Sequence, residues 1–279
     1  MKFSRITFEG RNSLLVLILI STHLLLASPK ASQTPDIILL AAHNQEQAMA
    51  VRDRTRYQQE LAVERFKLGA KPDDGNAAAE KDSRKLGERT TVVSIEPAPT
   101  VDALGRREVL VRIVSDTDDR GNPKPHIDPK GQPGILVEIL WDELFFPLQE
   151  EKLPFLQFDA IPSDDSAVVR YRFEPKVQAK SLILASGSVS IEAATGRVKE
   201  IRIEALHNLQ SIQKQLAKLE SISAEIQYEP FRGTWNLPSS ATGHGVSHLP
   251  HLDGFFQFKF REWGHEAVLD IPEPQGVQF

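Results

Sequence analysis

The sequence predicts an α+β, mainly β fold: a curved antiparallel half-barrel with an N-terminal helix and a second inserted helix packing on its concave face. Three observations lead to this prediction. Apolar and polar residues alternate with period two through most of the second half, which is typical of strands with one wet face. A Thr-Gly pair separates two such segments, as in a tight hairpin. Helical spacing is confined to short segments.

The clearest strand pair runs from Gly187 to Ala205. Apolar residues at 189 and 191, and again at 201 and 203, alternate with serine and charged residues. Between them stands Ala194-Thr195-Gly196-Arg197, where Gly196 can adopt the positive φ that a tight turn requires. The sequence therefore predicts a hairpin with one apolar face and one charged face.

Composition and charge limit the classes of function. The chain has 279 residues, of which 41% are hydrophobic, and carries a formal charge of -5. An acidic chain without a basic run argues against nucleic-acid binding, which needs clustered lysine and arginine. The chain contains no cysteine, so disulfides, thiolate zinc sites and cysteine nucleophiles are excluded.

Residues 1–27 have the pattern of a signal peptide. A basic start is followed by an apolar run from Ser13 to Ala27, which is short for a spanning helix of roughly 20 apolar residues. An uncleaved membrane anchor is the alternative. The predicted location is therefore outside the cytoplasm, either periplasmic or extracellular, with one domain at 28–270 and a frayed tail at 271–279.

The first half of the domain predicts one helix and several strands. Thr34 is expected as N-cap with Pro35 at the first helical position, and helical spacing continues to about Arg54. A strand is expected after Thr55, followed by a polar, mobile excursion at 69–88. Strands are expected at 91–95, ending at the prolines of 97–99, and at 109–113. The apolar run 135–148 fits a helix or a strand equally well.

The second half predicts further strands around one helix. Alternation predicts strands starting at 153–158, over 169–173 before Pro175, over 222–228, and over 256–260. A small-residue strand is expected near 239–248. Leu209 to Leu219 has apolar residues at spacings of three and four, which predicts a short amphipathic helix that covers the sheet. The sheet is expected to contain eight to eleven strands.

Several motifs resemble the family of exported lipoprotein-sorting carriers, whose half-barrels hold acyl chains beneath helices. The hairpin 187–198 is similar to its G-x-V-x-I-D-x-x-T-G-x-V pattern, with Glu192 in place of aspartate. Phe173-Glu174-Pro175 is similar to its F-x-P strand end, and Trp235-Asn236-Leu237-Pro238 to its W-L-P strand start, with Asn236 inserted. The resemblance covers residues 170–263 and implies the fold and a carrier function.

An apolar groove is the predicted ligand site, because such a half-barrel has more apolar face than two helices can hide. Packing beneath a helix is the alternative role for each of its side chains. The expected ligand is a lipid or an acylated protein, and transient contact with an envelope membrane fits the same role. The predicted lining consists of Tyr171, Phe173, Val189, Ile191, Ile201, Ile203, Ile226, Tyr228, Phe256, Phe258 and Phe260.

A histidine cluster is the second candidate site. His244, His248 and His251 are the residue type that binds zinc or iron, and they suggest a metal-dependent hydrolase as an alternative function. Four positions along a strand, however, separate side chains by roughly 13 Å, unless Gly243 and Gly245 bend the chain. Exposed histidines on a loop-rich edge are therefore the expectation, and no metal site is assigned.

Other motifs give no catalytic residue and no cofactor site. Asp116 to Asn122 resembles the start of a calcium loop, but Arg120 occupies a ligand position and Ile127 stands where the last glutamate belongs. An ordinary acidic turn is expected there. The sequence as a whole favours a non-enzymatic, exported binding or carrier protein. A structural envelope protein that docks a partner through a sheet edge is a further alternative.

Overall fold

The computed structural model describes residues 34–67, 85–101, 107–125, 138–176, 181–209, 214–249, 252–271 and 273. They form one antiparallel sheet with two α-helices, α2 (Asp36–Arg52) and α3 (Glu138–Phe145). Among these described helices, none has the length and apolarity that crossing a bilayer requires. The predicted leader at 1–27 lies outside the described residues.

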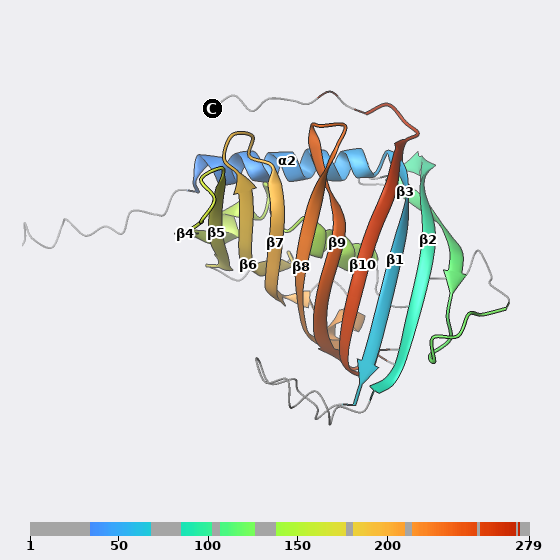
Figure 1. Cartoon of the computed structure of the whole chain (residues 1–279). Coiled ribbons are helices and arrows are strands. Elements are labelled where there is room, and N and C mark those ends of the chain that lie inside the picture. The colour runs from blue at the N-terminus through green and yellow to red at the C-terminus, as the bar shows by residue number, and fades with distance from the viewer. Residues whose placement is uncertain are drawn as a thin grey trace, which may run out of the picture. The chain divides into compact units, whose positions relative to one another are not determined.

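Ten strands form the sheet, in the order β3-β2-β1-β10-β9-β8-β7-β6-β5-β4 (Figure 1). The sheet does not close, because β3 and β4 stand at its two edges. The expected open, mainly β half-barrel is therefore confirmed. The strands are β1 (Thr55–Phe66), β2 (Lys85–Val101), β3 (Arg107–Asp116), β4 (Leu156–Ile161), β5 (Val168–Pro175), β6 (Leu184–Glu192), β7 (Val198–His207), β8 (Leu219–Phe231), β9 (Trp235–Ser247) and β10 (Gly254–Ala267).

One face of the sheet, called the inner face below, carries the apolar core. Phe256, Phe258 and Phe260 of β10 are buried on it, whereas Gln257 and Lys259 between them are exposed on the outer face. The same alternation runs along β6, β7 and β8. The period-two pattern in the sequence therefore assigned the two faces correctly.

Helix α2 lies across the strands and covers the inner face from β7 to β1 (Figure 1). It buries Ile38, Ala41, Ala42, Ala48 and Val51, which recur every three or four residues. The alanines let the helix lie close to the sheet. Its start differs from the prediction, since Pro35 rather than Thr34 is the N-cap and no side chain caps the helix.

The second covering helix comes from a different segment than predicted. Residues 138–145 form α3, which resolves the ambiguous apolar run 135–148 as a helix followed by an extended end. The expected helix at Leu209–Leu219 is wrong for the described residues. Only a 3-10 turn, Lys214–Lys218, precedes β8, which already includes Leu219.

The bounds of strand β2 differ from the prediction at both ends. It begins at Lys85, so the polar excursion ends earlier than expected, and residues 68–84 lie outside the described part of the chain. It also continues through the prolines to Val101. The pairing with β1 stops at Ile95, so Pro97 lies opposite β3 alone. Its missing amide hydrogen therefore leaves no carbonyl group of β1 without a donor.

The hairpin turn at 193–197 packs onto α2. The Asn44 amide donates to the Thr195 carbonyl at 3.0 Å, and Gly196 has a φ of 68°. A Cβ at Gly196 would stand 2.4 Å from Cγ of Leu40. Arg197 joins the turn to the next one by donating to the Gly233 carbonyl at 2.7 Å. The Thr-Gly motif thus serves both the turn and its contact with the helix.

Replacing Gly196 should therefore destabilise the fold more than replacing a glycine in a similar but open turn. Gly233 has a φ of 71° and no atom near its absent Cβ, so Gly233→Ala should cost only the backbone penalty of about 1–2 kcal/mol. Gly196→Ala should cost about 1–3 kcal/mol more, because the new methyl group overlaps Leu40. Urea unfolding of both variants measures the difference, and equal free energies of unfolding would contradict the packing role.

Candidate ligand-binding face

All eleven residues of the predicted groove lining lie on or beside the inner face. Ten of them are buried, and the partly buried Tyr171 packs against the same cluster. The cluster joins strands β4 to β10 and β1 with residues of α2 and α3. In this structure the lining residues therefore contact protein side chains, and their role towards a ligand stays a proposal.

Residues 138–148, called the plug below, supply many of the apolar side chains that cover the inner face. The side chains of Leu140, Leu144, Phe145, Phe146 and Leu148 are fully buried in the core cluster. The plug is as apolar as the face on which it lies. It consists of a helix of two turns and a short extended end, so it has little helical stability of its own and depends on this packing.

Aromatic rings join the plug to β10. Trp141 lies 5.1 Å from the ring of Phe260 and 5.8 Å from that of Phe258, while Phe145 lies 4.6 Å from Phe260. Trp141 also stacks on Phe145 at 5.4 Å. The predicted aromatic row of β10 thus forms the surface that receives the plug.

Polar side chains fasten the end of the plug from two sides. Gln45 of α2 accepts a hydrogen bond from the Leu148 amide at 3.1 Å and donates to the Phe145 carbonyl at 3.4 Å. The Tyr228 hydroxyl of β8 donates to the same carbonyl. Burial raises the pKa of Tyr228, so its hydroxyl keeps this proton. These contacts satisfy backbone groups left free after the last turn of α3.

Ionic contacts hold the segment that follows the plug. Lys152 and Glu143 form a buried ion pair at 2.5 Å. Burial raises the pKa of Glu143 despite the lysine. On α2, the Glu46 carboxylate accepts from the Glu150 amide at 2.8 Å, and His43 lies 3.2 Å from the Glu150 carboxylate. Hydrogen bonds and ion pairs therefore hold the plug and the segment after it at a few positions, and the apolar side chains of the plug contribute packing contacts.

A buried ion pair closes one end of the inner face. Arg52 of α2 donates two hydrogen bonds to the Glu262 carboxylate of β10, at 2.9 and 2.8 Å, and lies 3.5 Å from Asp142 of α3. Its guanidinium also lies over the Tyr57 ring. Burial alone would raise the pKa of Glu262, but the Arg52 charge and the hydrogen bonds from His265 and Arg52 outweigh it and lower that pKa.

The same cluster places Thr55, His265 and Glu262 in the order of a nucleophile, a base and an acid. His265 lies 3.4 Å from the Thr55 hydroxyl and 3.3 Å from Glu262. The Thr55 hydroxyl, however, donates to the Arg52 carbonyl and is 1% exposed. Glu262 is already bound by Arg52. A substrate cannot reach this hydroxyl as the residues stand, so the cluster serves to join helix and sheet.

The histidine candidates do not come together. His244 lies on the outer face and contacts Ser223, whereas His248 lies beyond the end of β9 near Asp253 and Glu220. His251 lies outside the described residues. No group of three or more potential metal ligands occurs within the described part of the chain.

The glycines beside His244 do not bend the strand. The pairing of β9 with β10 is continuous from Ser240 to Ser247. A Cβ at Gly243 or Gly245 would stand 2.5 or 2.7 Å from the ring of Phe258 or Phe256, respectively. The glycines therefore make room for these rings on the inner face. The sequence pattern had suggested a bend because the aromatic neighbours across the strand are not visible in it.

The acidic turn after β3 is stabilised by its own neighbours. Arg89 and Lys124 bind the Asp116 carboxylate, at 2.7 and 2.5 Å. Burial alone would raise the pKa of Asp116, but these partners and Thr91 lower it to about 2. Asp118 accepts hydrogen bonds from the backbone amides of Arg120 and Asn122. Both carboxylates are thus engaged within the turn, as an ordinary acidic turn requires.

Loss of the Glu262 carboxylate should strongly destabilise the protein. Glu262→Gln removes the carboxylate that binds the buried Arg52 most closely and leaves only Asp142 at 3.5 Å, which should cost about 3–5 kcal/mol. Glu266→Gln is the matched control, because Glu266 lies on the same strand as Glu262 but pairs with Arg56 of β1 in an exposed position, so its loss should have little effect on stability.

Urea unfolding across a pH series tests this assignment. The pKa of Glu262 is lowered in the folded protein, so its stabilisation is complete above the ordinary value of 4.5 and declines as pH falls through the lowered value. The difference between wild type and Glu262→Gln should shrink over that acidic range. Equal losses for Glu262→Gln and Glu266→Gln at neutral pH would contradict the buried ion pair.

Comparisons with known proteins give a likeness of fold. No protein-family model and no curated protein sequence matches the chain. A LolA superfamily protein from Nitrosomonas europaea aligns with 84% of this chain and 95% of its own, at 10% identity and a TM-score of 0.30. A putative outer membrane lipoprotein-sorting protein domain from Vibrio parahaemolyticus aligns with 83% and 94%, at 8% identity and a TM-score of 0.34.

A third similar structure is MucB in complex with MucA(peri), at 11% identity and a TM-score of 0.21, covering 79% of this chain and 93% of that one. The first two descriptions name the family that the motifs of residues 170–263 resemble. The likeness concerns the fold alone.

Proposed function

We propose that this protein is a non-enzymatic, exported binding protein whose inner face takes up an apolar chain when the plug leaves. The occupant is a lipid acyl chain or the acylated end of a partner protein. The observation that carries the proposal is the plug itself, a short segment that fills the inner face with apolar side chains. Its polar ties to α2 and β8 are hydrogen bonds at Phe145 and Leu148 and the ion pair of Asp142 with Arg52.

The buried side chains of the plug are apolar, so we expect a ligand that takes its place to be apolar as well. Leu, Trp and Phe side chains lie against the phenylalanine row of β10. Uncovering this face costs about 25 cal/mol for each Å² of apolar surface exposed to water. An acyl chain restores the same burial without directional contacts, so it can exchange for the plug at small net cost. The polar ties then determine how readily the plug leaves.

The location supports an acylated or lipid ligand. Residues 1–27 have the charge and apolar run of an export signal, and the chain has no cysteine for a disulfide or thiolate chemistry. A protein outside the cytoplasm encounters lipids that must cross water, and a covered apolar face suits their transport. The binding residues in this proposal are the eleven inner-face residues named above.

Fixing the segment directly after the plug to α2 should hold the plug in place and abolish ligand binding. The cysteine-free chain allows a clean double variant, His43→Cys with Glu150→Cys, because these side chains meet at 3.2 Å. A short reducible bismaleimide joining the two cysteines should prevent saturable binding of a fluorescent fatty acid, and reduction of the linker should restore it. The same variant without linker and each single-cysteine variant are the controls. Absence of saturable binding by the unlinked protein would overturn the proposal, as would unchanged binding after linking.

A second candidate function is docking of another polypeptide along the free edge of β3. Five of the six residues from Val109 to Val114 are apolar, and Leu110 and Val114 are 58% and 51% exposed. Apolar residues on both faces are typical of an interior strand. The opposite edge, β4, is short and carries Asp159, as protected edges do. In this candidate function, β3 pairs with an added strand, and a second copy of the chain can supply one.

Edge docking predicts a concentration-dependent association that one charge on β3 prevents. Sedimentation equilibrium should show dimers for the wild type and monomers for Leu110→Lys, because a lysine at an edge strand opposes pairing. Asp159→Lys on β4 is the matched control and should behave as the wild type. A wild type that stays monomeric at all concentrations, or a Leu110→Lys variant that dimerises equally well, would exclude this pairing.

A further inference from the structure

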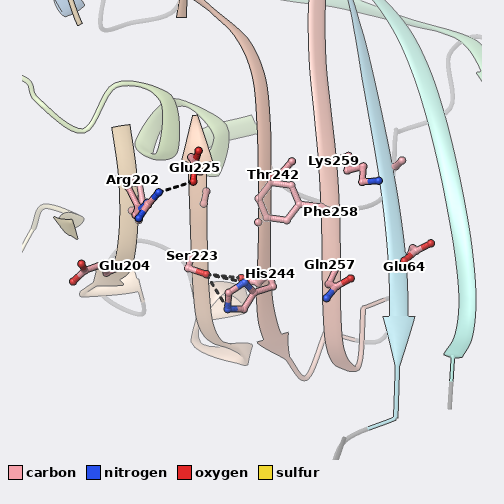
Figure 2. Close-up of a pocket in the computed structure, with 14 residues that line it drawn as sticks. Glu64, Arg202, Glu204, Ser223, Glu225, Thr242, His244, Gln257, Phe258 and Lys259 are labelled. Atoms are coloured by element: carbon pink, nitrogen blue, oxygen red, sulfur yellow. Dashed lines mark hydrogen bonds and ion pairs between the residues drawn. The ribbon is translucent and has the colours of Figure 1, made fainter. Parts of the chain in front are cut away.

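The outer face of the sheet contains a hollow with mixed polar and apolar lining that the proposed function does not use. Its volume is about 970 Å³, and it spans β7, β8, β9, β10 and β1 on the side opposite the plug (Figure 2). Strand pairing arranges its side chains in two cross-strand rows. The first row is Arg202, Glu225, Thr242, Lys259 and Ala62, and the second is Ser223, His244, Gln257 and Glu64.

Side-chain size gives the hollow its form. Ala62, Thr242 and Ser223 are short, while Arg202, Glu225 and Glu64 beside them are long. Directly opposed residues on neighbouring strands lie about 5 Å apart, so short side chains at successive positions leave space above the sheet. Lys259 stands between Ala62 and Thr242, and its ammonium group borders this space (Figure 2).

The charged residues around the hollow are almost all paired. Glu225 binds Arg202 at 2.9 Å, Glu204 binds Arg172 at 3.2 Å, and Glu64 binds Lys85 at 2.9 Å. His244 and Ser223 bind each other. Each acidic group of the hollow therefore has a basic partner, which reduces its repulsion of an incoming anion.

Three donor side chains remain without such a partner. Lys259 has no ion pair, and Thr242 and Gln257 have no side-chain hydrogen bond, within the part of the chain that the structure describes (Figure 2). Thr242 lies directly opposite Lys259, and Gln257 is two positions away on the same strand and the same face. An ammonium, a hydroxyl and an amide group thus line the same hollow.

We propose that this hollow binds an oxyanion, a phosphate or carboxylate group, through Lys259 with Thr242 and Gln257. The ammonium group supplies a positive charge, and the hydroxyl and amide groups supply neutral hydrogen-bond donors. The oxygen atoms of a phosphate or carboxylate accept hydrogen bonds from all three kinds of donor. The site lies on the outer face, so it operates whether or not the inner face binds an apolar chain. The oxyanion is a small free anion or the headgroup of an anionic lipid.

Titration of the full-length, isotope-labelled protein with inorganic phosphate tests the site by NMR. The backbone amides of Thr242, Gln257 and Lys259 should shift saturably. Lys259→Met should raise the dissociation constant by about tenfold, since a charge-assisted hydrogen bond is lost. Lys259→Arg should retain binding, and Thr242→Val should weaken it. Lys176→Met, at the end of β5, is the control and should bind as the wild type.

Two further probes separate the sources of the anion. Acetate tests the carboxylate, and co-sedimentation with phosphatidylglycerol vesicles, against phosphatidylcholine vesicles, tests the lipid headgroup. Saturable shifts with phosphate or acetate that need Lys259 support a small free anion, and vesicle binding that needs Lys259 supports the headgroup. Absence of both, or equal binding by Lys259→Met that unfolds like the wild type, overturns the site. Neither result depends on the fatty-acid measurement, so the inner-face proposal stands or falls separately.

Discussion

The burial of one apolar sheet face is the constraint on which the structure depends. Eight of the ten antiparallel strands, β1 and β4 to β10, contribute apolar side chains to the core cluster of the inner face, and the sheet does not close to hide them. Helix α2 and the plug must therefore supply the cover. The face is wide and the helices have only 17 and 8 residues, so the extended end of the plug, with Phe146 and Leu148, is needed as well.

The two covers are attached in different ways. Helix α2 is anchored through Arg52 and Glu262, a buried pair whose separation leaves an unpaired charge in the core. The plug is attached at its end by neutral hydrogen bonds with Gln45 and Tyr228, and its helix also meets Arg52 through Asp142 at 3.5 Å. The two covers differ in their apolar side chains as well, since α2 buries small ones such as Ala41 and the plug buries large ones such as Phe145. Under the proposed function, the plug is the part that moves and α2 is the part that stays.

Period-two patterning was sufficient to predict the strands, their faces and the hairpin at 187–205, because each is a local consequence of alternation. The identity of the second helix could not be predicted. Residues 135–148 are apolar throughout, so periodicity did not separate helix from strand, while Leu209–Leu219 had helical spacing that the fold did not use. The continuation of β2 through Pro97 could not be predicted either. It depends on the end of the pairing with β1 at Ile95, which the local sequence does not reveal. The cross-strand neighbours of Lys259, Ala62 and Thr242, likewise depend on the order of strands in the sheet, which no local pattern in the sequence contains.

The two faces of the central strands have separate chemistry because the pleat keeps them apart. Phe258 faces the plug while its neighbours Gln257 and Lys259 face the hollow, so one strand serves an apolar site and a polar site. Gly243 and Gly245 connect the two sites physically, since their missing side chains let the rings of Phe258 and Phe256 lie against β9. Movement of these rings when the plug leaves would act on β9, which carries Thr242 and His244 on its other side. A ligand on one face can therefore affect the other through β9 and β10, and the effect is limited by how far two paired central strands can shift.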